Sequence, residues 1–253
     1  MAKLDLSAVL AHALAIGKAN NALILPLAGM FLLLPGIVTD QFLTAPAMVD
    51  PAATSQELME RLSLFAQQNW VPLLARGIVT SFGSLAILAL VLRTERPTVA
   101  EAMKHAVHVL PIFILANLLQ SMVVVSGIML FIVPGFYLIG RLLLVSAVAA
   151  NEGARNPIAP LARSIALTHG NGWRVFLLVA VIFIVGMIAA MVVTSLTGIF
   201  LTLLLPAEAA RLGQMIVGGL VETALAVAII LASAALYRAL SGKPAAPWPG
   251  GMV

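Results

Sequence analysis

The stretch that decides the fold is Ser126–Trp173, SGIMLFIVPGFYLIGRLLLVSAVAANEGARNPIAPLARSIALTHGNGW. It holds an apolar run, the break Pro134-Gly135, and a second apolar run with a single charge, Arg141. A polar segment at 151–156 follows, and a short amphipathic segment then leads to a new apolar run at Trp173. This pattern predicts two membrane-spanning helices joined by a tight turn at Pro134-Gly135, followed by a helix on the membrane surface.

The whole chain has the composition of an integral membrane protein. Hydrophobic residues make up 62% of it and charged residues only 9%, whereas a soluble domain carries roughly 25% charged residues. Its 253 residues suffice for six spans, since each span needs about 20 residues. The net charge of +4 fits the basic flanks of membrane helices, so we expect no nucleic-acid partner. The chain has no cysteine, which excludes disulfides and thiolate metal sites.

Six apolar segments are long enough to span a bilayer. They cover about 22–38, 71–92, 111–133, 135–150, 173–206 and 212–236. At 1.5 Å per residue the fifth segment exceeds a hydrocarbon core of about 30 Å, so we expect it to tilt or to break near Thr194–Gly198.

Amphipathic segments precede the first, third and fifth spans, at 5–19, 97–110 and 155–170. A further short helix is expected on the outer surface before the second span. Thr54 with Glu57, and Thr98 with Glu101, have the spacing of capping boxes. Ten of the fourteen basic residues lie in the loops and flanks on one side, which predicts that both termini are cytoplasmic.

The sequence therefore predicts an all-α integral membrane domain over residues 1–241. Its six transmembrane helices form three hairpins, each preceded by a cytoplasmic amphipathic surface helix. Weak pseudo-repeats at 4–96, 97–154 and 155–241 support this plan. The Pro- and Gly-rich tail at 242–253 is expected to be disordered.

A set of residues in the central stretch carries a resemblance to a known family: Pro134, Gly135, Tyr137, Arg141, Glu152, Ala162, Arg163, Ser164, Leu167, Gly170, Trp173 and Arg174. Over about 127–176 the chain resembles the YciC-type bacterial inner-membrane proteins. It is similar also to the membrane domain of some bacterial glycerophosphoryl diester phosphodiesterases. The resemblance implies a fold and a location in the bacterial inner membrane. It implies no activity, because in the phosphodiesterases a separate soluble barrel carries the catalysis.

Three charged residues fall inside predicted spans and away from the span ends: Arg76, Arg141 and Glu222. A charge at mid-membrane costs about 2.5–3.5 kcal/mol on insertion scales, so these residues are expected to pair. Glu222 could pair with Arg141 or with Arg76. An interhelical ion pair is favoured over a proton- or substrate-coupled site, because one carboxylate and two guanidiniums make a poor relay.

The predicted cytoplasmic helices carry basic residues that could bind anionic lipid headgroups: Lys104, Arg155, Arg163 and Arg174. The alternative is that these residues only follow the positive-inside rule. Glu101, His105 and His108 share a helical face, but a solvated polar face is favoured over a metal site. We therefore predict no metal and no cofactor.

These observations predict a non-enzymatic protein of the bacterial inner membrane that organises the membrane or interacts with lipid. Membrane lipids are the expected partners, with other membrane proteins or self-association as further possibilities. The alternative is a small-solute or lipid transporter with a polar path near Arg141 and Glu222. A lipid enzyme ranks third, because no nucleophile–base spacing is visible.

Overall fold

The computed structural model describes residues 5–43, 54–93, 97–153 and 156–242. All regular elements in these ranges are helical. Six of the helical segments there are long and apolar enough to cross a membrane, as expected for an all-α, multi-pass membrane protein. The predicted tail after Gly242 and the basic residue Arg155 lie outside the described residues.

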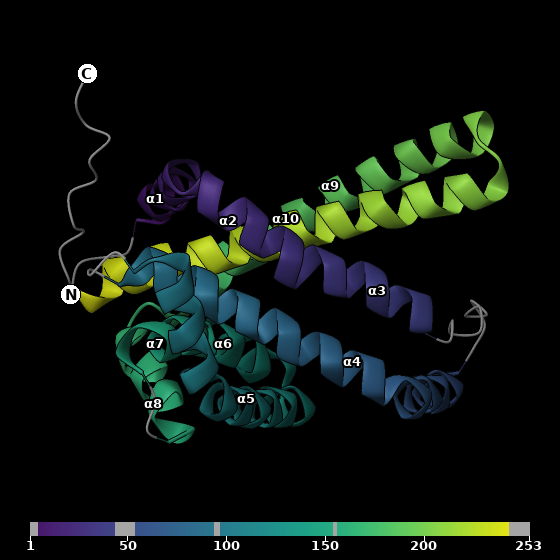
Figure 1. The fold of residues 1–253 in the computed structure, drawn as a ribbon. Coiled ribbons are helices and arrows are strands. Elements are labelled where there is room, and N and C mark those ends of the chain that lie inside the picture. The colour runs from purple at the N-terminus through teal and green to yellow at the C-terminus, as the bar shows by residue number, and fades with distance from the viewer. Residues whose placement is uncertain (1–4, 44–53, 94–96, 154–155, 243–253) are drawn as a thin grey trace.

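The elements follow one another along the chain with short connections (Figure 1). They are α1 (Leu6–Ala19), α2 (Asn21–Ala28), the π-helical turn η1 (Gly29–Leu33), α3 (Leu34–Phe42), α4 (Ser55–Leu92), α5 (Val99–Leu130), α6 (Ile132–Leu142), α7 (Val145–Glu152), α8 (Ile158–Leu167), α9 (Gly172–Leu204) and α10 (Ala207–Ser241). The segments of spanning length are α2–η1–α3, α4, α5, α6–α7, α9 and α10.

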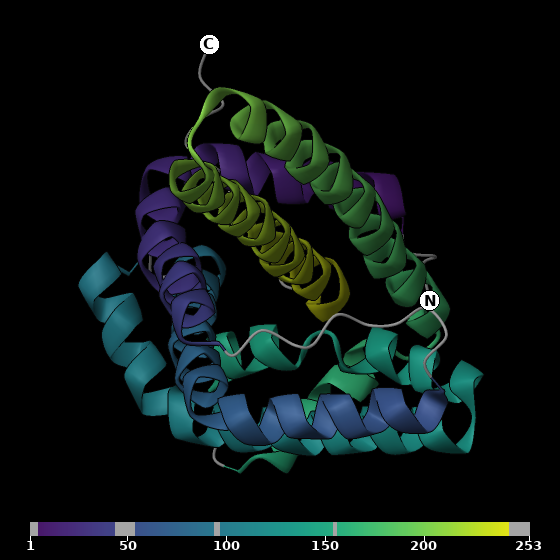
Figure 2. The same ribbon diagram turned by 90° about the vertical axis from the view of Figure 1, so that its right-hand side faces the viewer.

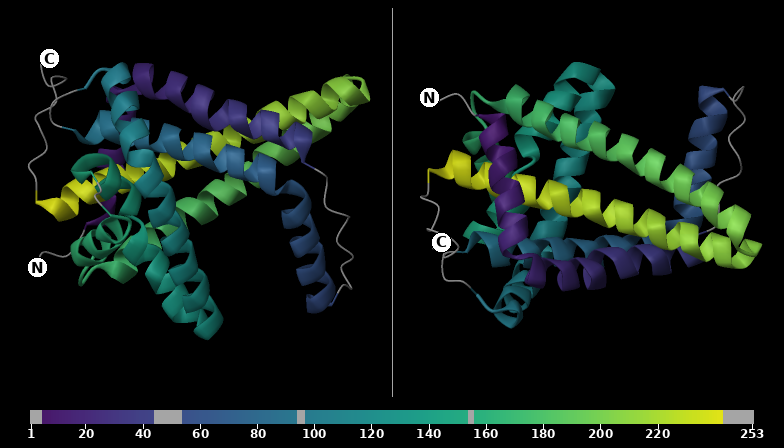
Figure 3. Two further views of the ribbon diagram at one scale, coloured as in Figure 1. Left: turned by 60° about the horizontal axis from the view of Figure 1, so that its bottom comes forward. Right: turned by 90° about the horizontal axis from the view of Figure 1, so that it is seen from above.

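The helices converge at one end of the molecule, which we call the base and which lies on the left in Figure 1. The base contains α1, α7 and α8, together with the last turns of α4 and α10 and the first turns of α5 and α9. Its core is built from the buried runs Leu85–Leu92, Ala147–Ala150 and Ile230–Tyr237. Helix α1 packs against α10 and lies across it (Figure 3, right).

Away from the base the helices diverge. The pair α9–α10 and the pair α5–α6 point in different directions, with α4 between them (Figure 3, left). Helix α9 has 33 residues, but only Gly172, Val175 and Leu178 are buried, and all three belong to its first two turns. We call the end of the molecule opposite the base the open end. Most of the apolar surface of α9 therefore faces outward from the bundle.

The connection between the third and fourth spans differs from the prediction. Helix α5 ends at Leu130, Phe131 is extended, and Pro134-Gly135 lies inside the first turn of α6 instead of forming the turn. Proline is tolerated there because the first N–H groups of a helix have no intrahelical partner. Gly135 serves a packing role, since a Cβ at this position would lie 2.6 Å from the backbone N of Ile128 in α5.

The expected break in the fifth span is absent, because α9 runs without interruption from Gly172 to Leu204. The hydroxyls of Thr194, Thr197 and Thr202 donate hydrogen bonds to carbonyls one turn earlier in the same helix. The polar groups that suggested a break are thus satisfied within the helix itself.

Two amphipathic segments expected as separate surface helices are continuous with the spans that follow them. Both predicted capping boxes are confirmed, at the N-termini of α4 and α5. Each helix then continues through an internal proline, Pro72 or Pro111. The first part of α4 nevertheless lies crosswise at the open end (dark blue in Figure 2). A proline removes one backbone hydrogen bond and lets a helix change direction without ending.

Candidate functional site

The buried charge Arg141 caps the C-terminus of α8. Its guanidinium donates to the backbone oxygens of Ile165 at 2.8 Å and Thr168 at 3.3 Å. It also lies 5.7 Å from the centre of the Tyr137 ring. The last carbonyls of a helix lack intrahelical donors and carry partial negative charge. A guanidinium supplies hydrogen-bond donors to these carbonyls and is attracted by their charge. Arg141 therefore does not pair with Glu222, which was one of the two predicted alternatives.

Helix α8 and the residue after it also donate hydrogen bonds to the end of α6. The hydroxyls of Ser164 and Thr168 donate to the backbone oxygen of Arg141 at 2.7 and 3.2 Å. Because α6 ends at Leu142, this carbonyl has no helical partner of its own. Each helix thus caps the other, and the contact fixes α8 against the end of α6.

Helices α6 and α9 cross at two glycines, Gly140 and Gly172. A Cβ on Gly140 would lie 2.7 Å from the backbone oxygen of Gly172, so only glycine allows this approach. Next to the crossing, the Trp173 ring packs on Tyr137 with centroids 5.3 Å apart. Close approach through glycines is a common way to pack helices in membranes, where hydrophobic burial gives little drive for association.

A second polar group joins α7, α8 and α10 around Glu152. The hydroxyl of Tyr237 donates to Glu152 Oε1 at 2.7 Å, and Arg163 Nε donates to the same oxygen at 3.2 Å. Asn151 Nδ2 in turn donates to the Tyr237 hydroxyl at 2.9 Å. The carboxylate is thereby held by α8, which follows α7 in the chain, and by the more distant α10.

The residues that carry the family resemblance therefore lie mostly together at the base. Arg141, Glu152, Arg163, Ser164 and Trp173 all contribute to contacts between α6–α7, α8, α9 and α10. Gly170 lies in the α8–α9 connection with φ +78, a conformation that favours glycine. Pro134 and Gly135 lie apart from this group, at the start of α6. The base cluster is suited to holding helices together.

The other charged residues within spans form an ion cluster between α3, α4 and α10. Arg76 pairs with Glu222 and, at 3.6 Å between Nη1 and Oδ1, with Asp40. Of the two pairings open for Glu222, the one with Arg76 is present. Asp40 lies two residues beyond the first predicted span, but in the structure it belongs to the last part of α3, where its carboxylate faces Arg76.

The basic residues considered for lipid contact have different environments. Lys104 is exposed near the start of α5, whereas Arg163 is bonded to Glu152. His105 Nε2 lies 2.8 Å from the Ala150 oxygen, and His108 Nδ1 lies 2.7 Å from the Lys104 oxygen. Because both contacts are with carbonyls, the nitrogens involved must carry the proton and donate. Among the described residues no group of three potential metal ligands comes together.

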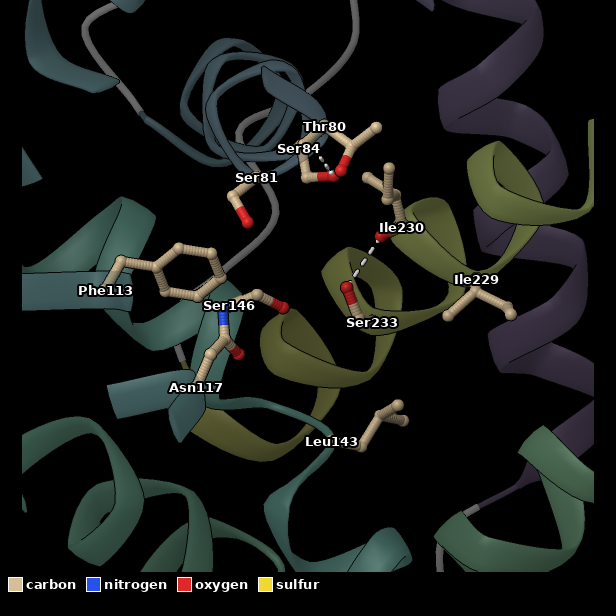
Figure 4. Close-up of a pocket in the computed structure, with 10 residues that line it drawn as sticks. All are labelled: Thr80, Ser81, Ser84, Phe113, Asn117, Leu143, Ser146, Ile229, Ile230 and Ser233. Atoms are coloured by element: carbon tan, nitrogen blue, oxygen red, sulfur yellow. Dashed lines mark hydrogen bonds between the residues drawn. The ribbon is translucent and has the colours of Figure 1, made fainter. Parts of the chain in front are cut away.

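A polar cavity of about 250 Å³ lies between α4, α5, α7 and α10 (Figure 4). Five hydroxyls and one amide line it, with apolar residues completing the wall: Thr80, Ser81, Ser84, Phe113, Asn117, Leu143, Ser146, Ile229, Ile230 and Ser233. The polar side chains converge on one space from three sides (Figure 4). The cavity is partly open to its surroundings. It contains neither Arg141 nor Glu222, the residues near which a polar path was predicted.

Most of the cavity residues were not singled out by sequence reasoning. A signal was present in the second span, where Thr80, Ser81 and Ser84 recur at i, i+1 and i+4 and so lie on one side of a helix. Ser146 and Ser233 are single small polar residues in apolar runs, and only the fold brings them to the same place.

No family model, curated protein or solved structure matches this chain. The resemblance to YciC-type proteins therefore stays a prediction based on the central stretch.

Proposed function

We propose that the chain is a non-enzymatic, multi-pass protein of a bacterial inner membrane that binds membrane lipid between its diverging helices. In this proposal the six spans form three hairpins, both termini are cytoplasmic, and the base lies at the cytoplasmic leaflet. The short helices α1 and α8, and the first turns of α5, are then the surface elements at that leaflet.

One observation carries the proposal: α9 crosses the membrane with its buried residues confined to Gly172, Val175 and Leu178. The same pattern holds for α10, whose buried residues cluster at Ile230–Tyr237 apart from Ala210. Apolar side chains that are exposed outside the packed base would be costly to leave in contact with water. Acyl chains are the matching neighbours of such a surface.

Lipid retention by the purified protein tests the proposal. Native mass spectrometry in a mild detergent should find bound phospholipid, and adding lipid back after delipidation should raise the unfolding temperature. Bound lipid stabilises the folded state by mass action because it has no comparable site on the unfolded chain. A lipid-free monomer with an unchanged unfolding temperature would contradict the proposal, as would a dimer that covers the same faces.

Lys104 is the exposed basic residue of the base for which anionic-lipid binding is proposed. A basic residue near a negatively charged leaflet contributes about 1 kcal/mol of attraction. Lys104→Gln should therefore reduce retention of anionic lipid several-fold. The matched control is Arg211→Gln, an exposed basic residue at the start of α10 on the opposite side of the bundle. Equal loss in both variants would indicate an effect of net charge alone.

The transporter alternative is favoured by one specific feature, a line of polar groups along α4. Arg76, Thr80 and Ser84 recur every four residues, and each hydroxyl donates to the backbone oxygen one turn before it. This line runs from the ion cluster to the cavity. Uptake of a small neutral solute into proteoliposomes, lost on Thr80→Val, would support transport over lipid binding.

A further inference from the structure

The cavity between α4, α5, α7 and α10 has polar groups in its wall but no charged one. Its wall offers the hydroxyls of Thr80, Ser81, Ser84, Ser146 and Ser233 and the amide of Asn117. No titratable side chain lines it. A phosphate or carboxylate in this cavity would lack a cation, and an ammonium group would lack a carboxylate. Burying an unpaired charge is strongly unfavourable, so an occupant must be neutral.

The wall can both donate and accept hydrogen bonds. Thr80, Ser84 and Ser233 donate to carbonyls of their own helices, which leaves their oxygens available as acceptors. Ser81, Asn117 and Ser146 make no hydrogen bond to the part of the chain that the structure describes. Their polar atoms remain accessible in the cavity, because none of them is a buried atom without a partner. An occupant with complementary groups therefore gains hydrogen bonds there.

Access to the cavity is blocked from the base. Immediately toward the base lie the fully buried Leu85 in α4, Ala147 in α7, Ala234 in α10 and, within α5, the nearly buried Phe113. On the other side the helices diverge toward the open end (Figure 3). The cavity is partly open, and a molecule that enters it away from the base would come from the hydrocarbon region. Such a route favours an amphiphile over a water-borne solute.

The volume agrees with a small polar group. About 250 Å³ would hold roughly eight waters at about 30 Å³ each, or the hydroxyl and ester groups of one lipid.

We propose that this cavity binds the uncharged, hydroxyl-bearing headgroup of a neutral membrane lipid, of which diacylglycerol is the simplest. The acyl chains then lie between the diverging helices. The inference rests on the proposed lipid-binding function and adds the class of lipid and the residues that recognise it. Asn117 supplies two donors and an acceptor, and Ser81 and Ser146 supply one hydroxyl each.

The test is photolabelling of the full-length protein in nanodiscs with a photoreactive diacylglycerol. Phosphatidylglycerol with the same chains and the same reactive group tests an anionic headgroup, and free glycerol as competitor tests a soluble polyol. We expect labelling by diacylglycerol at least tenfold above phosphatidylglycerol, with labelled peptides from α4, α5 or α10. Millimolar glycerol should not compete, because it lacks the chains.

Asn117→Leu keeps the size of the side chain and removes its hydrogen bonds, so it should reduce diacylglycerol labelling at least tenfold. The matched control is Gln120→Leu, one turn further along α5 and outside the cavity wall. Ser81→Ala is a milder second variant, expected to reduce labelling several-fold if Asn117→Leu fails to fold.

Three outcomes would overturn the inference: equal labelling by both lipids, competition by glycerol alone, or labelling that is the same in Asn117→Leu, Ser81→Ala and the control. If phospholipid is still retained in native mass spectrometry, only the inference fails and lipid binding stands. If no lipid is retained, both fail.

Discussion

Tyr237 of α10 donates a 2.7 Å hydrogen bond to Glu152 of α7, joining the ends of two helices that lie 85 residues apart. The Tyr237 side chain is almost completely buried, so its hydroxyl has few other places to bond. Arg163 of α8 binds the same carboxylate oxygen. One carboxylate oxygen in the base is therefore an acceptor shared between donors from two different helices.

Tyr237→Phe should destabilise the protein by about 1.5–3 kcal/mol, the usual worth of a hydrogen bond to a charged group. The ring remains in place, so packing is unchanged and the loss reports the hydroxyl. Unfolding by SDS in mixed micelles measures it. Tyr137→Phe is the control, because its hydroxyl receives only a 3.4 Å bond from Arg141, which keeps its two carbonyl partners. Equal losses in the two variants would contradict the role given to Glu152.

The ion cluster predicts unequal effects of neutralising its members. Arg76→Gln leaves Asp40 and Glu222 without a counter-ion, whereas Glu222→Gln leaves Arg76 still facing Asp40. We expect Arg76→Gln to give the lower folded yield in detergent. The triple variant with Asp40→Asn, Arg76→Gln and Glu222→Gln should recover much of that yield.

A double-mutant cycle on Arg76 and Glu222 should give a coupling energy of about 0.5–3 kcal/mol, as expected for residues in contact. The matched cycle between Arg141 and Glu222 should give a value near zero, because Arg141 is bonded to α8. Coupling of the same size in both cycles would contradict the assignment.

The crossing of α6 and α9 predicts a steric effect at Gly140. Gly140→Ala places a methyl group 2.7 Å from the Gly172 oxygen, so the helices must separate. Overpacking of this kind costs about 1–3 kcal/mol. Gly77→Ala is the control, because a Cβ there meets nothing within 4 Å. It should gain up to about 1 kcal/mol from the higher helix propensity of alanine. Thermal unfolding of both variants in the same detergent gives the comparison.

The sequence was sufficient for the six apolar spans and for two helix N-termini. Thr54 with Glu57 and Thr98 with Glu101 marked two N-termini correctly, because a capping box is a local interaction of four residues. Breaks within apolar runs were predicted less well. Pro134-Gly135 was predicted to form a turn, and the fifth span was predicted to tilt or to break near Thr194–Gly198. Whether a proline starts a helix, or a threonine bonds back to its own helix, depends on neighbours that the local pattern does not contain.

The partners of the charged and polar residues depended even more on the fold. The sequence left both Arg141 and Arg76 as possible partners for Glu222. Arg141 bonds to two backbone carbonyls instead, because the fold places the end of α8 next to it. Ser146 and Ser233 belong to helices α7 and α10, far apart along the chain. Their contribution to one cavity follows from how four helices pack, so no local pattern could have predicted it.

The last prediction concerns His12 in α1, which packs on α10. Burial lowers the pKa of His12 below its ordinary value of 6.5, and the positive charge of Arg238 lowers it further. Above the ordinary pKa the ring is neutral in both states. As the pH falls below it, the unfolded chain binds the proton first, so the free energy of unfolding decreases until the folded pKa is passed. Stability should thus be lower at pH 5 than at pH 8. His12→Gln should remove this part of the pH dependence, which SDS unfolding at the two pH values can measure. If His12→Gln keeps the full pH dependence of the parent protein, the packing of His12 near Arg238 is not what senses the proton.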